Sequence, residues 1–133
     1  MYQVIGTIFF TMKLLQTKMS RIDYDLIINI KSLREQNGWS QRTLSKKMGL
    51  ASTFVGKVES LSQPEKYNIR HVNLLIKAFN FKTVDQIFPK KMPFQDMVII
   101  HYKKVPKLKK DKTPSKFDEE VVVKIERIEK KEI

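Results

Sequence analysis

Four residues near the middle of the chain, Thr53, Gly56, Lys57 and Ser60, have types and spacing suited to contact with a negatively charged surface. They lie three or four positions apart, so in a helix they share one face. Glycine adds no bulk to that face, but it destabilises a helix by about 1 kcal/mol relative to alanine. Its presence despite this cost favours the explanation that another surface approaches the face closely. The pattern therefore predicts a helix that enters a polar, negatively charged groove. An ordinary solvated helix face is the alternative.

Other side-chain chemistry has little support in the sequence. There are two histidines and no cysteine. His71 has no second histidine, cysteine or cluster of carboxylates near it in the sequence, as a metal site or a general base would need. A glycine-rich phosphate loop is not present either. We therefore expect no enzyme, no catalytic residue, no metal and no cofactor.

Two short helices that meet at a glycine are predicted to position the polar face. Leu44 and Met48 lie four residues apart, on one side of a first helix, and Gly49 interrupts that pattern. Ser40 is suited to cap the start of this helix. The second helix has an apolar stripe opposite the polar face, formed by Phe54, Val55, Val58 and Leu61.

Further helices are predicted on both sides of this pair. A long amphipathic helix begins at a cap, either Ser20 or Asp23, and ends at Gly38, which can adopt a positive φ. Asn68 can cap the next helix after a proline-containing loop. Apolar residues in the segment 81–88 predict a last short helix, which makes five in all.

Six positions match a known motif in register: Gln41, Ser45, Gly49, Leu50, Val55 and Val58. With them the chain resembles the helix-turn-helix of the phage repressor and Cro class, the XRE family, across roughly residues 22 to 89. In that motif the small residue lets two helices cross closely, the glycine permits a sharp turn, and the aliphatic residues hold the pair together. The resemblance implies a mainly α fold, a five-helix repressor-like helix-turn-helix domain. Outside the resemblance, the residues after Pro89 add a predicted C-terminal two-stranded β extension to this fold class.

The resemblance also implies which side chains touch DNA. A recognition helix from about residue 52 to 60 would enter the major groove, with base contacts from Ser52, Thr53 and Lys57. Contacts to the DNA backbone would come from Gln41, Arg42, Lys66, Asn68 and Arg70. In the family, residues at the positions of Arg34 and Glu59 form an ion pair that ties the first helix to the recognition helix.

One position departs from the family pattern. Many members have serine or threonine at the position of Ala51, where the hydroxyl caps the recognition helix. Alanine cannot accept that hydrogen bond, and Ser52 is the alternative cap. The departure leaves the start of the recognition helix open.

The overall charge indicates a polyanionic partner. The formal net charge is +12 and the isoelectric point about 9.9, which suits nucleic acid or an acidic membrane surface. The basic residues are concentrated in the segment 90–116, which has nine of them and two acidic residues. The lack of cysteine suits a reducing, cytoplasmic environment.

The chain divides into three parts by composition. Residues 1–19 form an apolar N-terminal arm or an extended start, residues 20–89 the helix-turn-helix domain, and residues 90–133 a basic linker and β-hairpin-like extension. The apolar run of the first part is shorter than the 20 or so residues that span a membrane, so we expect no membrane partner. We assign the last part to dimerisation or partner binding.

The last part is predicted to contain two strands, at residues 97–102 and 121–125, because both segments are rich in β-branched residues. The lysine-rich segment between them contains two prolines and predicts a long, mobile connection. It either adds phosphate contacts or is only a solvated loop. Because an isolated hairpin is marginal in water, we expect it to pair with a second copy in a homodimer.

These patterns predict a sequence-specific transcriptional regulator that binds double-stranded DNA. An antitoxin, whose C-terminal extension binds a toxin, is the alternative from another functional class. An antitoxin would share the DNA-binding helices, so the two functions differ in what residues 90–133 bind.

Overall fold

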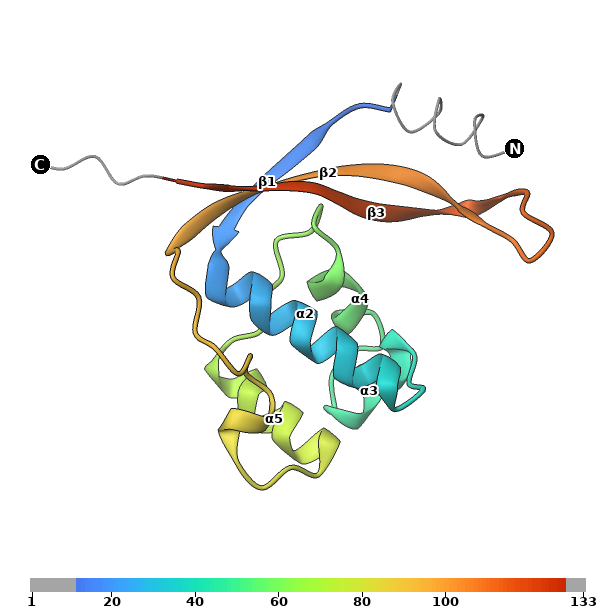
Figure 1. Cartoon of the computed structure of the whole chain (residues 1–133). Helices are drawn as coiled ribbons and strands as arrows, with labels where there is room; N and C mark the ends of the chain where they lie inside the picture. The colour runs from blue at the N-terminus through green and yellow to red at the C-terminus, as the bar shows by residue number, and fades with distance from the viewer. Residues whose placement is uncertain (1–11, 129–133) are drawn as a thin grey trace, which may run out of the picture. The chain divides into compact units, whose positions relative to one another are not determined.

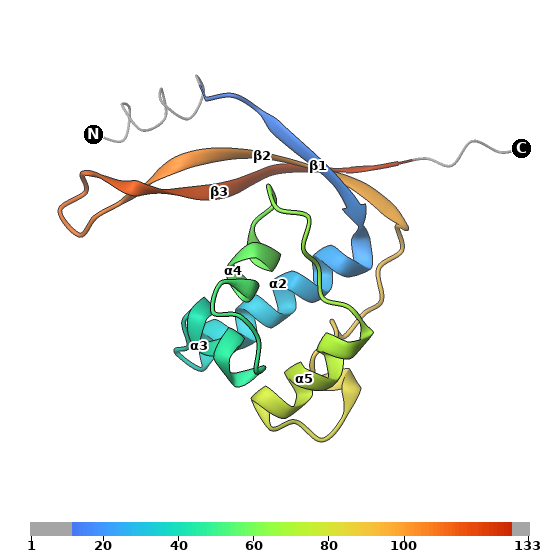
Figure 2. The ribbon, with the colours of Figure 1, turned by 180° about the vertical axis from the view of Figure 1, so that it is seen from behind.

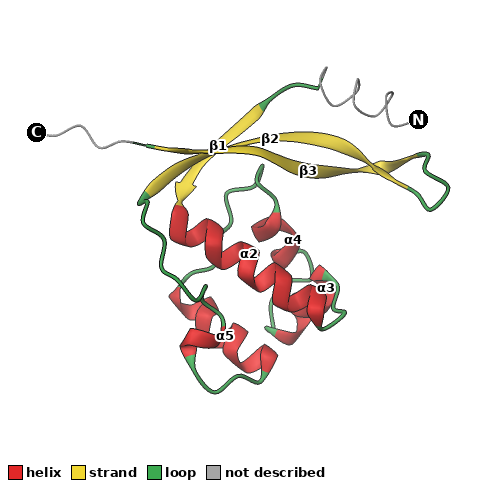
Figure 3. Ribbon diagram, in the orientation of Figure 1, coloured by secondary structure: helices red, strands yellow, loops and turns green. Residues whose placement is uncertain are grey.

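The computed structural model of the chain describes residues 12–128 (Figure 1). Contacts divide these residues into two compact units: a helical unit, residues 19–96, and a strand unit made of residues 97–128 with residues 12–18. Figure 3 shows that the helices belong to the first unit and the long strands to the second. Most of the predicted N-terminal arm, residues 1–11, lies outside the described residues.

Four α-helices form the helical unit: α2 (Arg21–Gln36), α3 (Gln41–Lys47), α4 (Phe54–Glu59) and α5 (Ile69–Phe79). A short 3₁₀ turn, Val84–Gln86, follows them. Seen from both sides, α3 and α4 lie beside the C-terminal half of α2 (Figures 1 and 2).

Local capping signals explain where these helices begin and end. The side-chain oxygens of Ser20, Ser40 and Asn68 each accept a 3.0 Å hydrogen bond from the backbone N–H three residues later. The last two caps were predicted, and Ser20 is the one of the two candidates that caps α2. Gly38 follows α2 with a φ of +69°. There the backbone N–H of Trp39 bonds to the carbonyl of Arg34 at 3.1 Å, which satisfies a helix-end acceptor.

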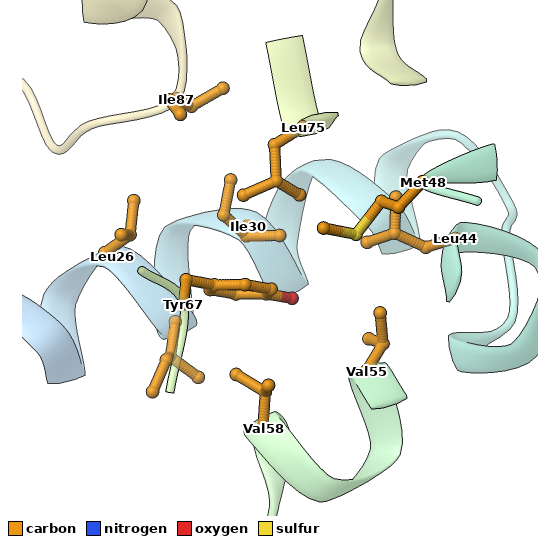
Figure 4. Packing of buried hydrophobic residues seen from close by; sticks show 10 residues of the cluster. Leu26, Ile30, Leu44, Met48, Val55, Val58, Tyr67, Leu75 and Ile87 are labelled. Carbon is orange, nitrogen blue, oxygen red and sulfur yellow. The ribbon is translucent and has the colours of Figure 1, made fainter. Parts of the chain in front are cut away.

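The core of the helical unit contains side chains from all four helices. Figure 4 shows Val58 of α4 pointing toward Tyr67, and Val55 on the side of the cluster where Leu44 and Met48 lie. Each fully buried aliphatic side chain of this size contributes about 1.5 to 3 kcal/mol. The cluster consists of Leu26, Ile27, Ile30, Leu44, Met48, Val55, Val58, Tyr67, Leu75 and Ile87. Ile69, the first residue of α5, lies outside this cluster and is 87% exposed.

Three strands form one sheet in the order β1 (Leu15–Ser20), β2 (Met97–Leu108), β3 (Pro114–Arg127). The long strands β2 and β3 pair antiparallel, from Val98 opposite Arg127 to Leu108 opposite Pro114. The register shifts once near Val123, which has no partner of its own, and again near the tip. β1 has six residues and β2 has twelve, so the far part of the hairpin is a two-stranded ribbon.

The predicted fold class, a mainly α five-helix domain with a two-stranded extension, is wrong. The described chain has four α-helices and a three-stranded antiparallel sheet. The expected fifth helix is reduced to a 3₁₀ turn, because the segment between Asn80, whose φ of +58° ends α5, and Pro89 is short. The added strand β1 comes from residues assigned to an apolar arm, since pairing with residues 80 positions away leaves no local signal.

The connection between the long strands is also shorter than expected. Residues 105–120 were predicted as a long, mobile segment, but β2 runs to Leu108 and β3 begins at Pro114. Only residues 109–113 form the turn. The prolines do not prevent this, because proline fits at a strand's first residue or beside an irregular register.

Candidate nucleic-acid interface

The turn between α3 and α4 is fixed by the backbone. Gly49 has a φ of +74°, the left-handed conformation that glycine adopts without steric cost. Its N–H bonds to the carbonyl of Lys46 at 2.9 Å, and the N–H of Leu50 bonds to the carbonyl of Ser45 at 3.0 Å. This pair of bonds is a Schellman motif, which ends α3 and sends the chain sharply toward α4.

Ser45 joins the two helices through a hydrogen bond that sequence reasoning missed. Its hydroxyl donates to the carbonyl of Gln41 at 2.9 Å and accepts from the backbone N–H of Val55 at 3.0 Å. The N–H of Val55 is one of the orphan donors in the first turn of α4. Thr53, the residue at the N-cap, makes no side-chain cap bond. The missing cap at Ala51 is therefore replaced from α3, and a small hydroxyl residue at position 45 was the signal.

Gly56 provides the space for the start of α3. A Cβ atom added at Gly56 would lie 3.1 Å from the side-chain oxygen of Gln41, closer than most real contacts. The amide of Gln41 also donates to Glu59 at 3.1 Å. The lack of bulk at Gly56 thus has an internal reason, close packing of Gln41 against α4, in addition to the approach to a groove expected from the sequence.

An ion pair between Arg34 and Glu59 connects α2 to the end of α4. Two guanidinium nitrogens donate to the two carboxylate oxygens at 2.9 and 2.8 Å, and a third donates to the carbonyl of Trp39 at 2.8 Å. The side chains are 9% and 3% exposed. Burial alone would lower the pKa of Arg34, but the hydrogen bonds and charge of Glu59 outweigh it and raise that pKa. The pair fixes the orientation of α4 relative to α2.

Ser52, Thr53 and Lys57 lie at the start and on the outer face of α4. Thr53 and Lys57 are exposed and Ser52 is half-buried, whereas Val55 and Val58 face the core. No hydrogen bond or ion pair is found for these three side chains in the described part of the chain. α4 begins at Phe54, two residues later than the helix predicted from the sequence. Of the three predicted base contacts, Lys57 therefore lies in the helix, and Ser52 and Thr53 lie in the turn before it.

The five predicted backbone contacts fall into two groups. Arg42 and Arg70 are exposed, and their side chains form no hydrogen bond or ion pair among residues 12–128. The other three have internal partners. Lys66 contacts the carbonyls of its own loop at 3.2 to 3.4 Å, Asn68 caps α5, and Gln41 bonds to Glu59. In this conformation, Arg42 and Arg70 are the members of the group that are ready to bind a phosphate.

Two lysines in the last turn of α3 add positive charge beside this face. Lys46 and Lys47 are exposed, and the amine of Lys47 lies 4.6 Å from the centre of the Trp39 ring. That ring in turn stacks on Phe79 with centroids 5.1 Å apart. A cation over an aromatic face is attracted by about 0.5 to 1 kcal/mol at an exposed site. Lys46 has no such contact.

The described residues contain no cluster of three or more histidine, cysteine, aspartate or glutamate side chains able to hold a metal ion. Within the same residues, no helix has the length and hydrophobicity needed to cross a membrane. Comparisons of the chain with protein-family models, with curated proteins and with solved structures found no match.

Proposed function

We propose that this chain is a cytoplasmic, sequence-specific regulator of transcription that binds double-stranded DNA through α3 and α4. The observation that carries the proposal is the rigid connection between these helices, together with the exposed side chains of Thr53 and Lys57, which have no hydrogen bond or ion pair within the described residues. The hydroxyl of Ser45 in α3 bonds to the backbone of α4, and the Arg34–Glu59 ion pair connects α4 to α2. Thr53 and Lys57 are left exposed. The resemblance of the motif to the XRE family supports the same function.

The chemistry of the exposed face suits the major groove. Lysine can donate to the O6 and N7 acceptors of guanine, whereas hydroxyl groups bind several base edges and discriminate less. In the proposed complex, Lys57 contacts a base and Ser52 and Thr53 contact neighbouring bases. Arg42 and Arg70 bind phosphates, which set the position of the protein but carry no sequence information.

A homodimer on paired half-sites is part of the proposal. One helix as short as α4, with six residues, contacts few base pairs. Two copies related by a twofold axis would read an inverted repeat, and the distance between its halves reports the geometry of the dimer. A selected DNA sequence with inverted symmetry is therefore the expected product of a binding experiment.

The test is selection of random duplex DNA by the purified protein at near-physiological salt. The Thr53→Ala/Lys57→Ala variant is compared with Lys77→Ala, which removes an exposed charge from α5. We expect the native protein and the Lys77 variant to enrich the same inverted repeat. On that site, Lys57→Ala alone costs about 1 to 3 kcal/mol and relaxes the preference at one position.

Two results would overturn the proposal. Salt-sensitive binding without any enriched sequence would show a basic protein that binds polyanions without reading them. Enrichment of the same sequence by the double variant would show that specificity lies outside α4. We expect each variant to fold, because the replaced side chains form no hydrogen bond or ion pair within the described residues.

A further inference from the structure

The far end of the β2–β3 hairpin carries four lysines that we call the basic tip: Lys107, Lys109, Lys110 and Lys112. Every residue from 107 to 114 is exposed. None of the four lysine side chains forms an ion pair or hydrogen bond within residues 12–128. The basic tip is therefore a concentrated positive charge on an ordered ribbon, not on a mobile linker.

The turn that holds these lysines is closed by hydrogen bonds. The N–H of Lys109 bonds to the carbonyl of Thr113 at 2.8 Å, and the N–H of Lys112 bonds to the carbonyl of Lys109 at 2.9 Å. Between the bonded residues Lys109 and Thr113, residues 110–112 therefore form a three-residue hairpin loop, in which a turn is followed by a residue in the left-handed conformation, here Lys112. The strands on both sides continue the ribbon, so the loop presents its side chains from a fixed backbone.

The acidic residue in the loop offsets one of the four lysine charges but forms no ion pair with any of the four. Asp111 accepts hydrogen bonds from the hydroxyl and the N–H of Thr113, at 2.6 and 3.1 Å. These bonds lower the pKa of Asp111. Its carboxylate thus serves to hold the turn. The other acidic residues of β3 lie further down the hairpin, where Glu120 is opposite Lys104 and Asp118 is opposite Pro106.

Lys112 occupies a position at which its side chain is unfavourable for the backbone. Its φ is +67°, and this conformation favours glycine in a loop of this type. A non-glycine residue in this left-handed conformation leads to the hypothesis that its side chain has a function. A charge at the apex of the loop is what this lysine supplies and glycine would not.

We propose that the basic tip binds the phosphate backbone of double-stranded DNA, as a contact separate from α4. The identity of the polyanion rests on the proposed function, because DNA is the partner proposed for α4. Each lysine that neutralises a phosphate releases a counterion, and this term depends on salt but not on sequence. The basic tip therefore adds affinity, while the choice of sequence remains with the face of α4.

The test measures DNA affinity as a function of salt for the full chain with four lysines of the tip changed to glutamine. The matched control changes Lys31, Lys77, Lys82 and Lys90 to glutamine, which removes the same charge from exposed positions of the helical unit. We expect the tip variant to bind any duplex about tenfold or more weakly and to lower the salt slope by about 2 to 4. The control changes both quantities much less.

A single substitution separates charge from folding. Lys112→Gly removes one charge and relieves the left-handed backbone at the same position. We expect the salt slope to fall by about one, with no loss of thermal stability. Equal or tighter binding by this variant would overturn the assignment of Lys112, because a purely structural role predicts no loss of affinity.

The outcomes also separate this inference from the proposed function. A reduced salt slope in the tip variant, with no enriched sequence for the native protein, would retain the basic tip and reject the sequence-specific regulator. An unchanged slope, or an equal loss in the matched control, would reject the basic tip as a DNA contact. If the tip variant loses binding to vesicles that contain anionic lipids but binds DNA as tightly as the native protein does, DNA is rejected as the partner of the basic tip.

Discussion

The helical unit has thirteen basic and seven acidic residues and the strand unit has eleven and five, so both carry a net charge of +6, yet they arrange their charges in opposite ways. In the helical unit, several charged groups are fixed by contacts. Arg34 is buried against Glu59, Lys47 lies over Trp39, and Lys66 contacts loop carbonyls. In the hairpin, the lysines of the basic tip extend into solvent without partners. Two units of equal net charge therefore differ: the charged groups of the helical unit are held in a defined geometry, and those of the hairpin are concentrated at its tip.

This difference indicates what each proposed DNA contact, that of α4 and that of the basic tip, contributes to binding. A side chain reads a base edge only if its backbone is held in place, and α4 is held by Ser45 and by the Arg34–Glu59 pair. Attraction to phosphate needs charge but little precision. Substitutions in the helical unit should therefore change stability or sequence preference, and those in the basic tip should change affinity alone.

The largest effect is expected for Arg34→Ala, which tests whether the helical unit depends on its buried pair. Removing one partner leaves the carboxylate of Glu59 buried without its charge partner, which costs about 3 to 5 kcal/mol. Denaturant unfolding followed by Trp39 fluorescence measures this, because the chain has a single tryptophan and it lies in the helical unit. The amide resonances of β2 and β3 should be unaffected at low denaturant.

Two controls make that prediction sharper. Arg42→Ala removes an exposed arginine of α3 and should change the free energy of unfolding by less than about 0.5 kcal/mol. Arg34→Met/Glu59→Leu removes both charges and should cost less than the sum of the single changes. Equal costs for Arg34→Ala and Arg42→Ala would contradict a role of the pair in holding α4.

A smaller effect is expected for Ser45→Ala, which tests the cap provided by α3. The N–H of Val55 would be left buried without an acceptor, at a cost of about 1 to 3 kcal/mol. Thermal or denaturant unfolding measures the loss. Ser52→Ala is the matched control and should be nearly neutral, because α4 has no side-chain cap at its own start. The reverse order of the two losses would show that Ser52 caps α4.

The sequence predicted local features well and non-local ones poorly. The caps at Ser20, Ser40 and Asn68 depend on residues within one helical turn, and all three form. β1 was not predicted, because its pairing partner β2 lies about 80 residues later in the chain and no local sequence pattern indicates this pairing. Position 45 was recognised for its small size, but its bond to Val55 required the two helices to be placed in space.

The same distinction applies to the candidate interface. The exposed stripe at Thr53 and Lys57 follows from helical periodicity, which the sequence carries. The hydrogen bonds of Gln41 to Glu59 and of Lys66 to its own loop do not follow from periodicity. They depend on where the chain folds back on itself. Sequence reasoning also treated the lysine-rich segment as a mobile connection, since it did not recognise the short loop in which Asp111 and Thr113 close the turn.

The smallest effect is expected for the pH dependence of the helical unit, and it contrasts the two histidines, one in each unit. His71 Nδ1 accepts a 3.0 Å hydrogen bond from the N–H of Asn68, and a protonated ring has no acceptor. Burial, together with the charge of Arg70, lowers the pKa of His71 below its usual value. His101, in the hairpin, lies 3.2 Å from Glu126 instead.

Since the pKa of His71 is lower in the folded than in the unfolded chain, the unfolded chain binds more protons as the pH falls through this range. The contribution of His71 is therefore fully present above about pH 6.5 and is lost as the pH falls through its lowered folded pKa. Unfolding followed by Trp39 fluorescence at several pH values measures this slope. His71→Gln keeps an acceptor without a titrating ring and should flatten the slope, whereas His101→Gln should leave it unchanged. A slope that persists in His71→Gln would assign the pH dependence to other groups, and one removed by His101→Gln would show that the two units do not unfold independently.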